Sequence, residues 1–408
     1  MILRTLLRDH LPSSLKDFFN TFESDLSIPQ FDHFQAWITG ILQGTSEATK
    51  ISGPLSERHP SSLTRFMNSE AWNEDDLNKQ RIGWAANIMC QKYMKYYPLI
   101  IDDTINQKYG KLLDGAGKHF SHMEGKVVWG QQLVTSHMVL AQADLPLFVD
   151  LYRKKEEFKD ESKFRSKIDI ALDHIKRFPK IGGRKGVVLT DTWYASVKII
   201  NQTLSSGFHG VFDLKCDRQV NYEGVKYSVS DLAEQIEKTD FDLVKIDGRL
   251  FRVWTAKIKV PRVQQKKSRL LISQQELNSG KNEKRKWSKY KYLLSTDTSM
   301  SPWLIIYLYR RRWKVESFYR FVKNCFNFVG VRLEDQMAIQ RYFNLVFFAY
   351  TYLILTRDPL SSYYYETKSL YDAQKILQDK KLEEVIEWIY DRTMQGIDLS
   401  EIKDDLGL

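Results

Sequence analysis

Apolar residues recur with helical spacing through roughly the first 95 residues of the chain. The stretch FDHFQAWITGILQG has this spacing and ends at Gly44. A second helix is expected to open near Ser61 with a serine cap, and a third follows Asn73. The pattern therefore predicts a region of short helices, residues 1–95, separated by Gly and Pro.

From Tyr97 onward the pattern becomes that of strands alternating with helices. YPLIIDDT is typical of a short buried strand, and KVVWGQQLVTSHMVL of two strands or one hairpin. SKFRSKIDIALDHIKRF predicts an amphipathic helix, and GVVLTDTWYASVKIINQTL a buried strand that runs into a helix. Strands that alternate with helices in this way predict an α/β fold.

The rest of the chain divides into a β-rich part and a helical part. FDLVKID and RLFRVWTAKIKV, on either side of Gly248, predict a hairpin within residues 205–295. From Ser301 helices are expected to the end of the chain. The longest apolar run, Leu345 to Leu355, is too short to cross a bilayer and therefore predicts a buried core helix.

Composition narrows the class of protein. The 408 residues are 43% hydrophobic and 27% charged, which is ordinary for a folded chain of two or three domains. The formal net charge of +10 favours a polyanionic partner, most commonly nucleic acid. Three widely spaced cysteines and the lack of a signal-like N-terminus favour a reducing, cytoplasmic location without a membrane anchor. In this context the N-terminal helices, with Arg65 exposed, fit a helix-turn-helix bundle and a plain helical cap equally well.

A strongly basic stretch follows the expected hairpin. It contains aromatic residues between the charges, which favours a surface that follows a phosphate backbone and offers rings for stacking. A solvated loop is the alternative. The residues of interest are Lys284, Arg285, Lys286, Trp287, Tyr290 and Tyr292.

Four polar residues near position 316 have a spacing that places them on one side of a helix. Tyr309, Arg312, Glu316 and Lys323 fall within an arc of about 60° if they share one helix. Apolar Val315, Phe318 and Val322 fall on the opposite side. Most polar stripes of this kind are solvated faces. A carboxylate among cations that favour phosphate nevertheless suggests a metal ligand beside a phosphodiester.

Two acidic motifs upstream strengthen that second interpretation. Asp102 and Asp103 end one predicted strand, and Asp191 ends another. Strand ends are where ligand sites occur in α/β sheets. Two such aspartates and the later Glu316 can share a pair of Mg²⁺ ions, which prefer carboxylates, water and phosphate oxygens.

The ordered motifs IDDT, TDTWY and YRRRWKVESFYRFVK resemble those of the DDE transposases of bacterial insertion sequences, in particular the insertion-sequence-four family with its YREK helix. The resemblance covers roughly residues 96–335. It implies an RNase H-like core in two parts, 96–204 and 296–335, interrupted by a β-rich insertion at 205–295. A helical DNA-binding domain at 1–95 and a helical C-terminal region at 336–408, suited to dimerisation, complete the expected layout.

The resemblance also implies roles for individual residues. Asp103, Asp191 and Glu316 would bind two Mg²⁺ ions, with Mn²⁺ able to substitute. Asp103 is preferred because it directly precedes the threonine. Neighbouring residues of a strand face opposite sides, so only one of the two aspartates can face the metal, and Asp102 is the alternative. The phosphate-gripping residues would be Tyr309, Arg312 and Lys323, with Trp313 beside them. Stacking on a flipped base would fall to Tyr292, with Trp287 or Trp254 as alternatives.

The expected function is that of a cut-and-paste DNA transposase. Such an enzyme binds the terminal inverted repeats, cleaves the element's ends and joins their 3′-OH groups to target DNA, as a homodimer on double-stranded DNA. Two alternatives stay open at this stage. One is a DNA-binding or regulatory protein that keeps the fold without the chemistry, and the other is an RNase H-fold nuclease.

Overall fold

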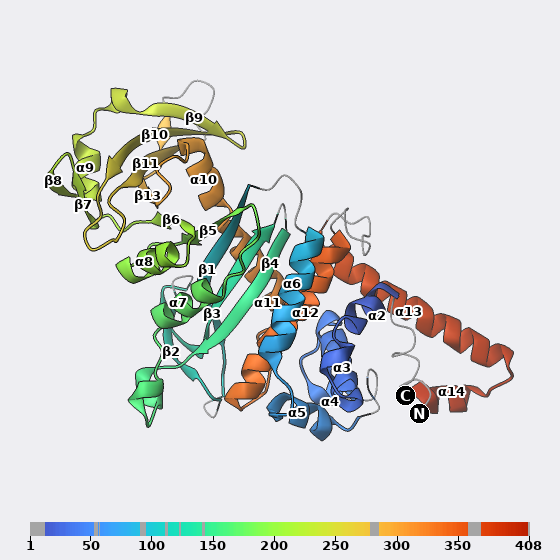
Figure 1. Cartoon of the computed structure of the whole chain (residues 1–408). Helices are drawn as coiled ribbons and strands as arrows, with labels where there is room; N and C mark the ends of the chain where they lie inside the picture. Colours follow the sequence, from blue (N-terminus) through green and yellow to red (C-terminus); the bar gives the residue numbers. More distant parts are fainter. Residues whose placement is uncertain are drawn as a thin grey trace.

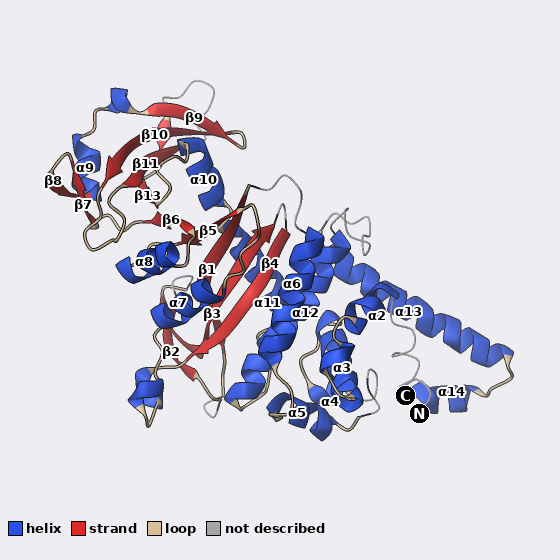
Figure 2. Ribbon diagram, in the orientation of Figure 1, coloured by secondary structure: helices blue, strands red, loops and turns tan. Residues whose placement is uncertain are grey.

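A large mixed β-sheet flanked by helices dominates the computed structural model (Figure 1, Figure 2). The structure describes residues 13–52, 56, 58–89, 95–110, 113–121, 124–140, 143–277, 285–357 and 369–406. The strands are β1 (Tyr96–Gln107), β2 (Ala116–Ser121), β3 (Lys126–Leu140), β4 (Ala143–Tyr152), β5 (Lys185–Thr190), β6 (His209–Asp213), β7 (Gln219–Tyr222), β8 (Val225–Ser228), β9 (Asp242–Ile246), β10 (Arg249–Ile258), β11 (Ser268–Leu277), β12 (Lys286–Trp287) and β13 (Lys291–Ser295). The α-helices are α2 (Ser13–Asn20), α3 (Ile28–Leu42), α4 (Ala48–Ile51), α5 (Pro60–Asn68), α6 (Glu74–Met89), α7 (Lys167–Arg177), α8 (Val197–Ser205), α9 (Val229–Gln235), α10 (Pro302–Arg310), α11 (Trp313–Cys325), α12 (Gln336–Arg357), α13 (Leu370–Met394) and α14 (Leu399–Leu406).

The centre of the sheet is a parallel trio, β1, β5 and β6. Ile100 of β1 pairs with Leu189 of β5, and Leu189 pairs with Val211 of β6. On the other side of β1, strand β3 runs antiparallel, and β4 pairs with β3. The predicted α/β character is confirmed, and the parallel trio brings three strand ends to one edge of the sheet.

Two strand predictions differ from the structure. β1 is not a short strand that stops at the aspartates, because antiparallel pairing with β3 carries it on to Gln107. KVVWGQQLVTSHMVL forms the single strand β3 rather than two strands or a hairpin. Gly130, where a turn could lie, instead sits where a Cβ would come within 2.4 Å of the Asn106 carbonyl oxygen. Close approach to β1 therefore explains the glycine without a turn.

The β-rich segment extends the main sheet. β13 pairs with β6, and the sheet continues through β11 and β10 to β9. The predicted hairpin is confirmed as β9–β10, which turns at Asp247 and Gly248 with φ values of 46° and 77°. Two consecutive positive φ values are typical of tight hairpin turns. The expected boundary at residue 205 falls just before β6, which is a strand of the parallel trio.

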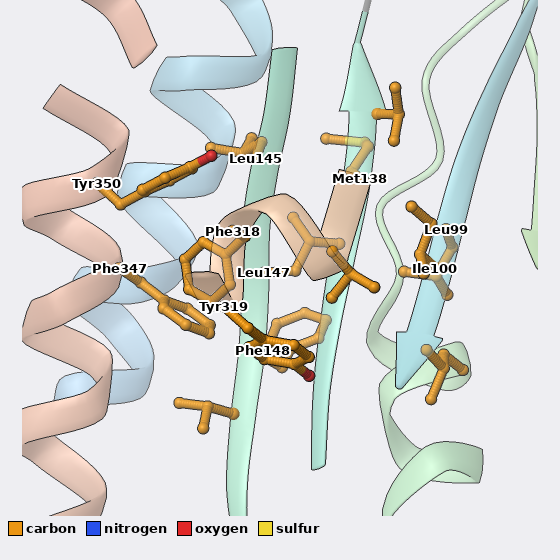
Figure 3. Packing of buried hydrophobic residues seen from close by; sticks show 14 of the residues in the cluster. Leu99, Ile100, Met138, Leu145, Leu147, Phe148, Phe318, Tyr319, Phe347 and Tyr350 are labelled. Carbon is orange, nitrogen blue, oxygen red and sulfur yellow. The ribbon is translucent and has the colours of Figure 1, made fainter. Parts of the chain in front are cut away.

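The helices at the two ends of the chain pack together on the side of β4. α12 contacts β4, α3, α5, α6 and α13, and it buries the whole of Leu345 to Leu355, as predicted. Phe318 and Tyr319 of α11 lie between the sheet and α12, with the Phe318 ring 4.7 Å from that of Tyr350 (Figure 3). In the described part of the chain, no helix is both long and apolar enough to cross a membrane.

Two local helix predictions need correction. α5 begins at Pro60 with His59 as its cap, whose ring nitrogen accepts from the Ser61 amide, so the cap is not a serine. The expected single helix through Tyr309 and Lys323 is two helices, α10 and α11, with a turn at Arg311 and Arg312. The amide of Arg312 donates to Tyr309 over three residues rather than four, which marks the tightened turn.

Candidate active site

Three aspartates lie level with one another at the ends of the parallel trio. Asp102, Asp191 and Asp213 each follow, by two residues, the paired positions Ile100, Leu189 and Val211. The Asp191 carboxylate accepts hydrogen bonds from the amides of Trp193 and Tyr194, at 3.0 and 3.1 Å, which fixes the turn after β5. The sheet register thus places an acidic row along one edge.

Arg312 connects this row to α11. One guanidinium nitrogen lies 2.8 Å from Asp102 Oδ2, and the other lies 3.2 Å from Glu316 Oε1. The arginine side chain is 15% exposed and that of Asp102 is 18% exposed, so this pair is shielded from solvent. Asp102, Arg312 and Glu316 therefore form one charged group, and the polar stripe is not a solvated face.

Asp103 points to the other face of the sheet. Its carboxylate accepts a hydrogen bond from the Tyr194 hydroxyl at 2.9 Å and pairs with the Lys167 ammonium at 3.3 Å. Alternation along β1 separates the two neighbouring aspartates. The structure thus brings Asp102, and not the preferred Asp103, to the face that carries Glu316. The threonine that guided the preference, Thr104, lies on the Asp102 side and accepts from Lys323.

The remaining polar residues of the stripe also contact the sheet. The Tyr309 hydroxyl donates to Asp213 Oδ2 at 3.1 Å. The Lys323 ammonium donates to Thr104 Oγ1 at 2.8 Å and to the Ile105 carbonyl at 3.1 Å. Arg312 Nε is buried and has no hydrogen-bond partner among the described residues. That nitrogen is therefore a buried donor whose hydrogen bond no described residue accepts.

Electrostatics at the acidic row follow from burial. Burial raises the pKa of Asp102 to about 7, although Arg312 opposes this shift, and the neighbouring charges of Asp191 and Asp103 add to it. Burial also raises the pKa of Asp213, against the effect of Lys291. Burial alone would lower the pKa of Arg312, but the Asp102 carboxylate and its neighbours raise it overall. Burial in the row therefore disfavours the charged forms of Asp102 and Asp213, and the cations Arg312 and Lys291 oppose this effect only in part.

The residues fit a divalent cation in chemical kind. Carboxylate oxygens are the ligands that Mg²⁺ prefers, and a cation beside the buried Asp102 would favour its charged form, whose pKa burial raises to about 7. Among the residues described, no three His, Cys, Asp or Glu side chains are close enough together to hold a metal ion. The Glu316 carboxylate is paired with Arg312, so it does not join the aspartates of the row in a ready-made metal site.

The structure does not bring the expected stacking and basic residues to the acidic row as one group. Tyr292 of β13 stacks on Tyr290, with ring centroids 6.4 Å apart, and Trp254 packs edge-on against Tyr222. Trp287 lies under the Arg252 guanidinium, at 5.0 Å. Arg285 pairs with Glu276 at 3.3 Å and Lys286 is exposed, while Lys284 lies outside the described residues.

Trp313 and Arg65 are exposed in different places. Trp313 is 62% exposed and lines a groove of about 590 Å³ at the α10–α11 turn. The other residues of this groove are Asp247, Arg249, Tyr307, Arg310, Arg311 and Lys314. Arg65 lies on α5, across the central strands from the β9–β13 extension (Figure 1).

Asp213 and Lys291 are site residues that the sequence analysis did not single out. Lys291 Nζ lies 2.6 Å from Asp213 Oδ2. A signal was present, because HGVFD is an apolar strand that ends in an aspartate, as VVLTD is. Asp213 falls in the segment expected to be the β-rich insertion, so this strand end was not expected to belong to the site.

Comparisons with known proteins agree with the geometry. A model described as DDE superfamily endonuclease matches residues 43–230, and one described as transposase DDE domain matches residues 163–352. A probable transposase for insertion sequence element IS701 from Microchaete diplosiphon is 26% identical over 132 residues, which are 32% of this chain and 34% of the relative. The match thus spans about a third of that curated relative. Over residues 43–352 the chain is similar to DDE transposases and endonucleases.

Proposed function

We propose that this chain, which is similar to DDE transposases, is a cut-and-paste DNA transposase. The observation that carries the proposal is the acidic row, in which Asp102 and Asp191 lie level on adjacent strands and Arg312 links Asp102 to Glu316. The mixed strand order β4-β3-β1-β5-β6, with helices packed beside it, supports an RNase H-like core.

Asp102, Asp191 and Glu316 are the proposed metal ligands. Bound Mg²⁺ or Mn²⁺ would activate the attacking oxygen and stabilise the leaving oxygen at phosphorus. Asp102 is chosen over Asp103 because only Asp102 shares a face with Glu316. The buried, unpartnered Arg312 Nε and the third donor of the Lys323 ammonium are suited to bind phosphate oxygens of the cleaved strand.

DNA recognition is proposed for surfaces on either side of the core. The overall charge of +10 supports a polyanionic ligand. On the N-terminal side, the exposed Arg65 of α5 is the proposed contact. The first turn of the next helix, α6, would repel phosphate, because it carries Glu74, Asp75 and Asp76. On the other side, Arg285, Lys286 and the exposed Trp313 are proposed to contact DNA near the cleaved end.

A homodimer is proposed to hold two element ends. α13 extends beyond the other helices (Figure 1). It exposes large apolar residues every four positions, Leu382, Ile386, Tyr390 and Met394, each at least 56% exposed. One exposed apolar face on a projecting helix supports pairing with a second copy.

The test uses duplex DNA made from the inverted repeats that bracket this reading frame. With Mg²⁺ or Mn²⁺, the full chain should cleave the end and join its 3′-OH to a target plasmid, and EDTA should stop both. Asp191→Asn and Glu316→Gln should lose both activities by several orders of magnitude. Asp217→Asn and Glu161→Gln, which change exposed carboxylates elsewhere, are the matched controls.

The outcomes separate the open alternatives. Cleavage without joining would identify a nuclease rather than a transposase. Tight binding of the end duplex without cleavage in either metal would identify a DNA-binding protein that has lost the chemistry. Unchanged cleavage by Asp191→Asn would refute the site assignment.

A further inference from the structure

Asp213 holds together two parts of the molecule that meet at the acidic row. Its Oδ2 accepts from Lys291 Nζ at 2.6 Å and from the Tyr309 hydroxyl at 3.1 Å. Lys291 opens β13 of the extension, whereas Tyr309 lies on α10, one turn before Arg312. Asp213 itself is only 4% exposed. Both of its partners are therefore fixed relative to Asp191 on the neighbouring strand.

Lys291 is less buried than the carboxylate that binds it. Its side chain is 47% exposed, compared with 6% for that of Asp213. The ammonium also lies 5.2 Å from the centroid of the Tyr309 ring. A lysine ammonium has three donors, and Asp213 takes one of them. The exposed side of Lys291 can therefore accept an anion while the Asp213 contact stays in place.

The surroundings of Lys291 favour a phosphate as that anion. In the part of the basic stretch that the structure describes, Lys291 has its ammonium bonded to Asp213 of the acidic row. A lysine placed only to neutralise Asp213 would gain by being buried with it, because solvent weakens an exposed ion pair. A half-exposed ammonium held beside carboxylates is instead suited to bind a phosphate near them, because its positive charge offsets the repulsion between the carboxylates and the phosphate.

We propose that Lys291 is a phosphate-binding residue of the candidate active site and that Asp213 is the positioning residue that aims both Lys291 and Tyr309. The ligand is a single backbone phosphate of the DNA strand near its cleaved end. The proposal rests on the proposed transposase function. It adds two residues, from β6 and β13, to the site formed by Asp102, Asp191 and Glu316.

The test measures binding rather than cleavage. The full chain is titrated with the end duplex in Ca²⁺ or EDTA, and each phosphate near the end is replaced in turn by a neutral methylphosphonate. At one linkage the replacement should weaken binding by the wild type about 10-fold, but leave binding by Lys291→Gln unchanged. Lys291→Arg should restore the sensitivity. Loss of Lys291 should also reduce the slope of log affinity against log salt by about 0.9.

Matched variants keep the interpretation sharp. Lys289→Gln removes an exposed charge two residues away and should keep the wild-type response at the critical linkage. Asp213→Asn keeps an acceptor oxygen and should lose part of the sensitivity at that linkage, with an unchanged melting temperature. If every linkage affects wild type and Lys291→Gln equally, Lys291 is only a counter-ion and the inference is overturned. Failure of the wild type to bind the end duplex at all would instead overturn the proposed function.

Discussion

The Asp102 carboxylate and the Arg312 guanidinium lie 2.8 Å apart, although 210 residues separate them in the chain. Arg312 stands at the turn between α10 and α11, and Asp102 stands within β1. The second guanidinium nitrogen reaches Glu316 on the first full turn of α11. This contact identifies which of two adjacent aspartates shares the face of the sheet with the glutamate.

Replacing the two aspartates one at a time should distinguish their roles. Asp102→Asn is expected to abolish cleavage of the end duplex, because it removes a charged oxygen ligand from the acidic row. Asp103→Asn should keep most of the activity, because asparagine can still accept from Tyr194. Single-turnover cleavage with Mg²⁺ measures both. The reverse result would make Asp103 the ligand, as the family resemblance implies.

Much of the fold was predictable because it depends on local patterns. The apolar runs before Asp102 and Asp191 predicted β1 and β5, and the turn at Asp247 and Gly248 predicted the β9–β10 hairpin. The buried α12 followed from the long apolar run inside it. These features depend on residues close together in the chain, so the sequence could indicate them.

The side of the sheet that each residue faces was harder to predict. Asp102 and Asp103 differ by one position, and only the pairing of β1 with its neighbours decides which one meets α11. The break between α10 and α11 leaves no glycine or proline as a signal. At this break Tyr309 and Arg312 contact Asp213 and Asp102, on strands far away in sequence. Asp213 joins the site through the same long-range pairing.

Lysine should not be able to replace Arg312, because the guanidinium donates from two nitrogens and lysine offers a single ammonium. Arg312→Lys keeps the charge but cannot donate to Asp102 and Glu316 at once. Cleavage should fall about 10- to 100-fold, as expected for the loss of a charge-assisted hydrogen bond. Arg310→Lys, on the other side of the turn, is the control and should change cleavage little. Equal effects of the two variants would show that the Arg312 bridge has no special role.

The raised pKa of Asp102 should appear in the stability of the metal-free protein. In the folded chain burial raises this pKa to about 7, whereas an unfolded aspartate titrates near its ordinary value of about 4. Between these values the folded state binds more protons, so Asp102 makes the wild type less stable as pH rises through that window. The stability of Asp102→Asn relative to the wild type should therefore be greater at pH 8 than at pH 5, because the gap opens above about pH 4 and is complete above about pH 7.

Thermal unfolding in EDTA at the two pH values gives the measurement. The informative quantity is the difference between variant and wild type, because other titrating groups are common to both. Asp217→Asn, at an exposed position, should show the same difference at both pH values. A gap for Asp102→Asn that does not widen with pH would contradict the raised pKa.

Arg341 should dominate the attachment of the N-terminal helices. It is 3% exposed on α12, and its guanidinium pairs with Glu74 at 3.0 Å. It also donates to the backbone carbonyls of Met67 in α5 and of Ser69 and Trp72 between α5 and α6. Arg341→Met would leave those acceptors and the Glu74 charge without their donor. The free energy of unfolding should fall by about 3–5 kcal/mol, as for other broken buried ion pairs.

Urea unfolding followed by tryptophan fluorescence is the measurement, with Arg332→Met as the control. Arg332 is 81% exposed and lies 4.0 Å from Glu47, so its loss should cost less than about 1 kcal/mol. Trp72 lies under the Arg341 guanidinium at 4.4 Å and should report separation of these helices directly. Unfolding of Arg341→Met at the wild-type urea concentration would contradict this prediction. Packing of apolar side chains on α12 would then be sufficient to hold the N-terminal helices, and the buried arginine would contribute specificity rather than stability.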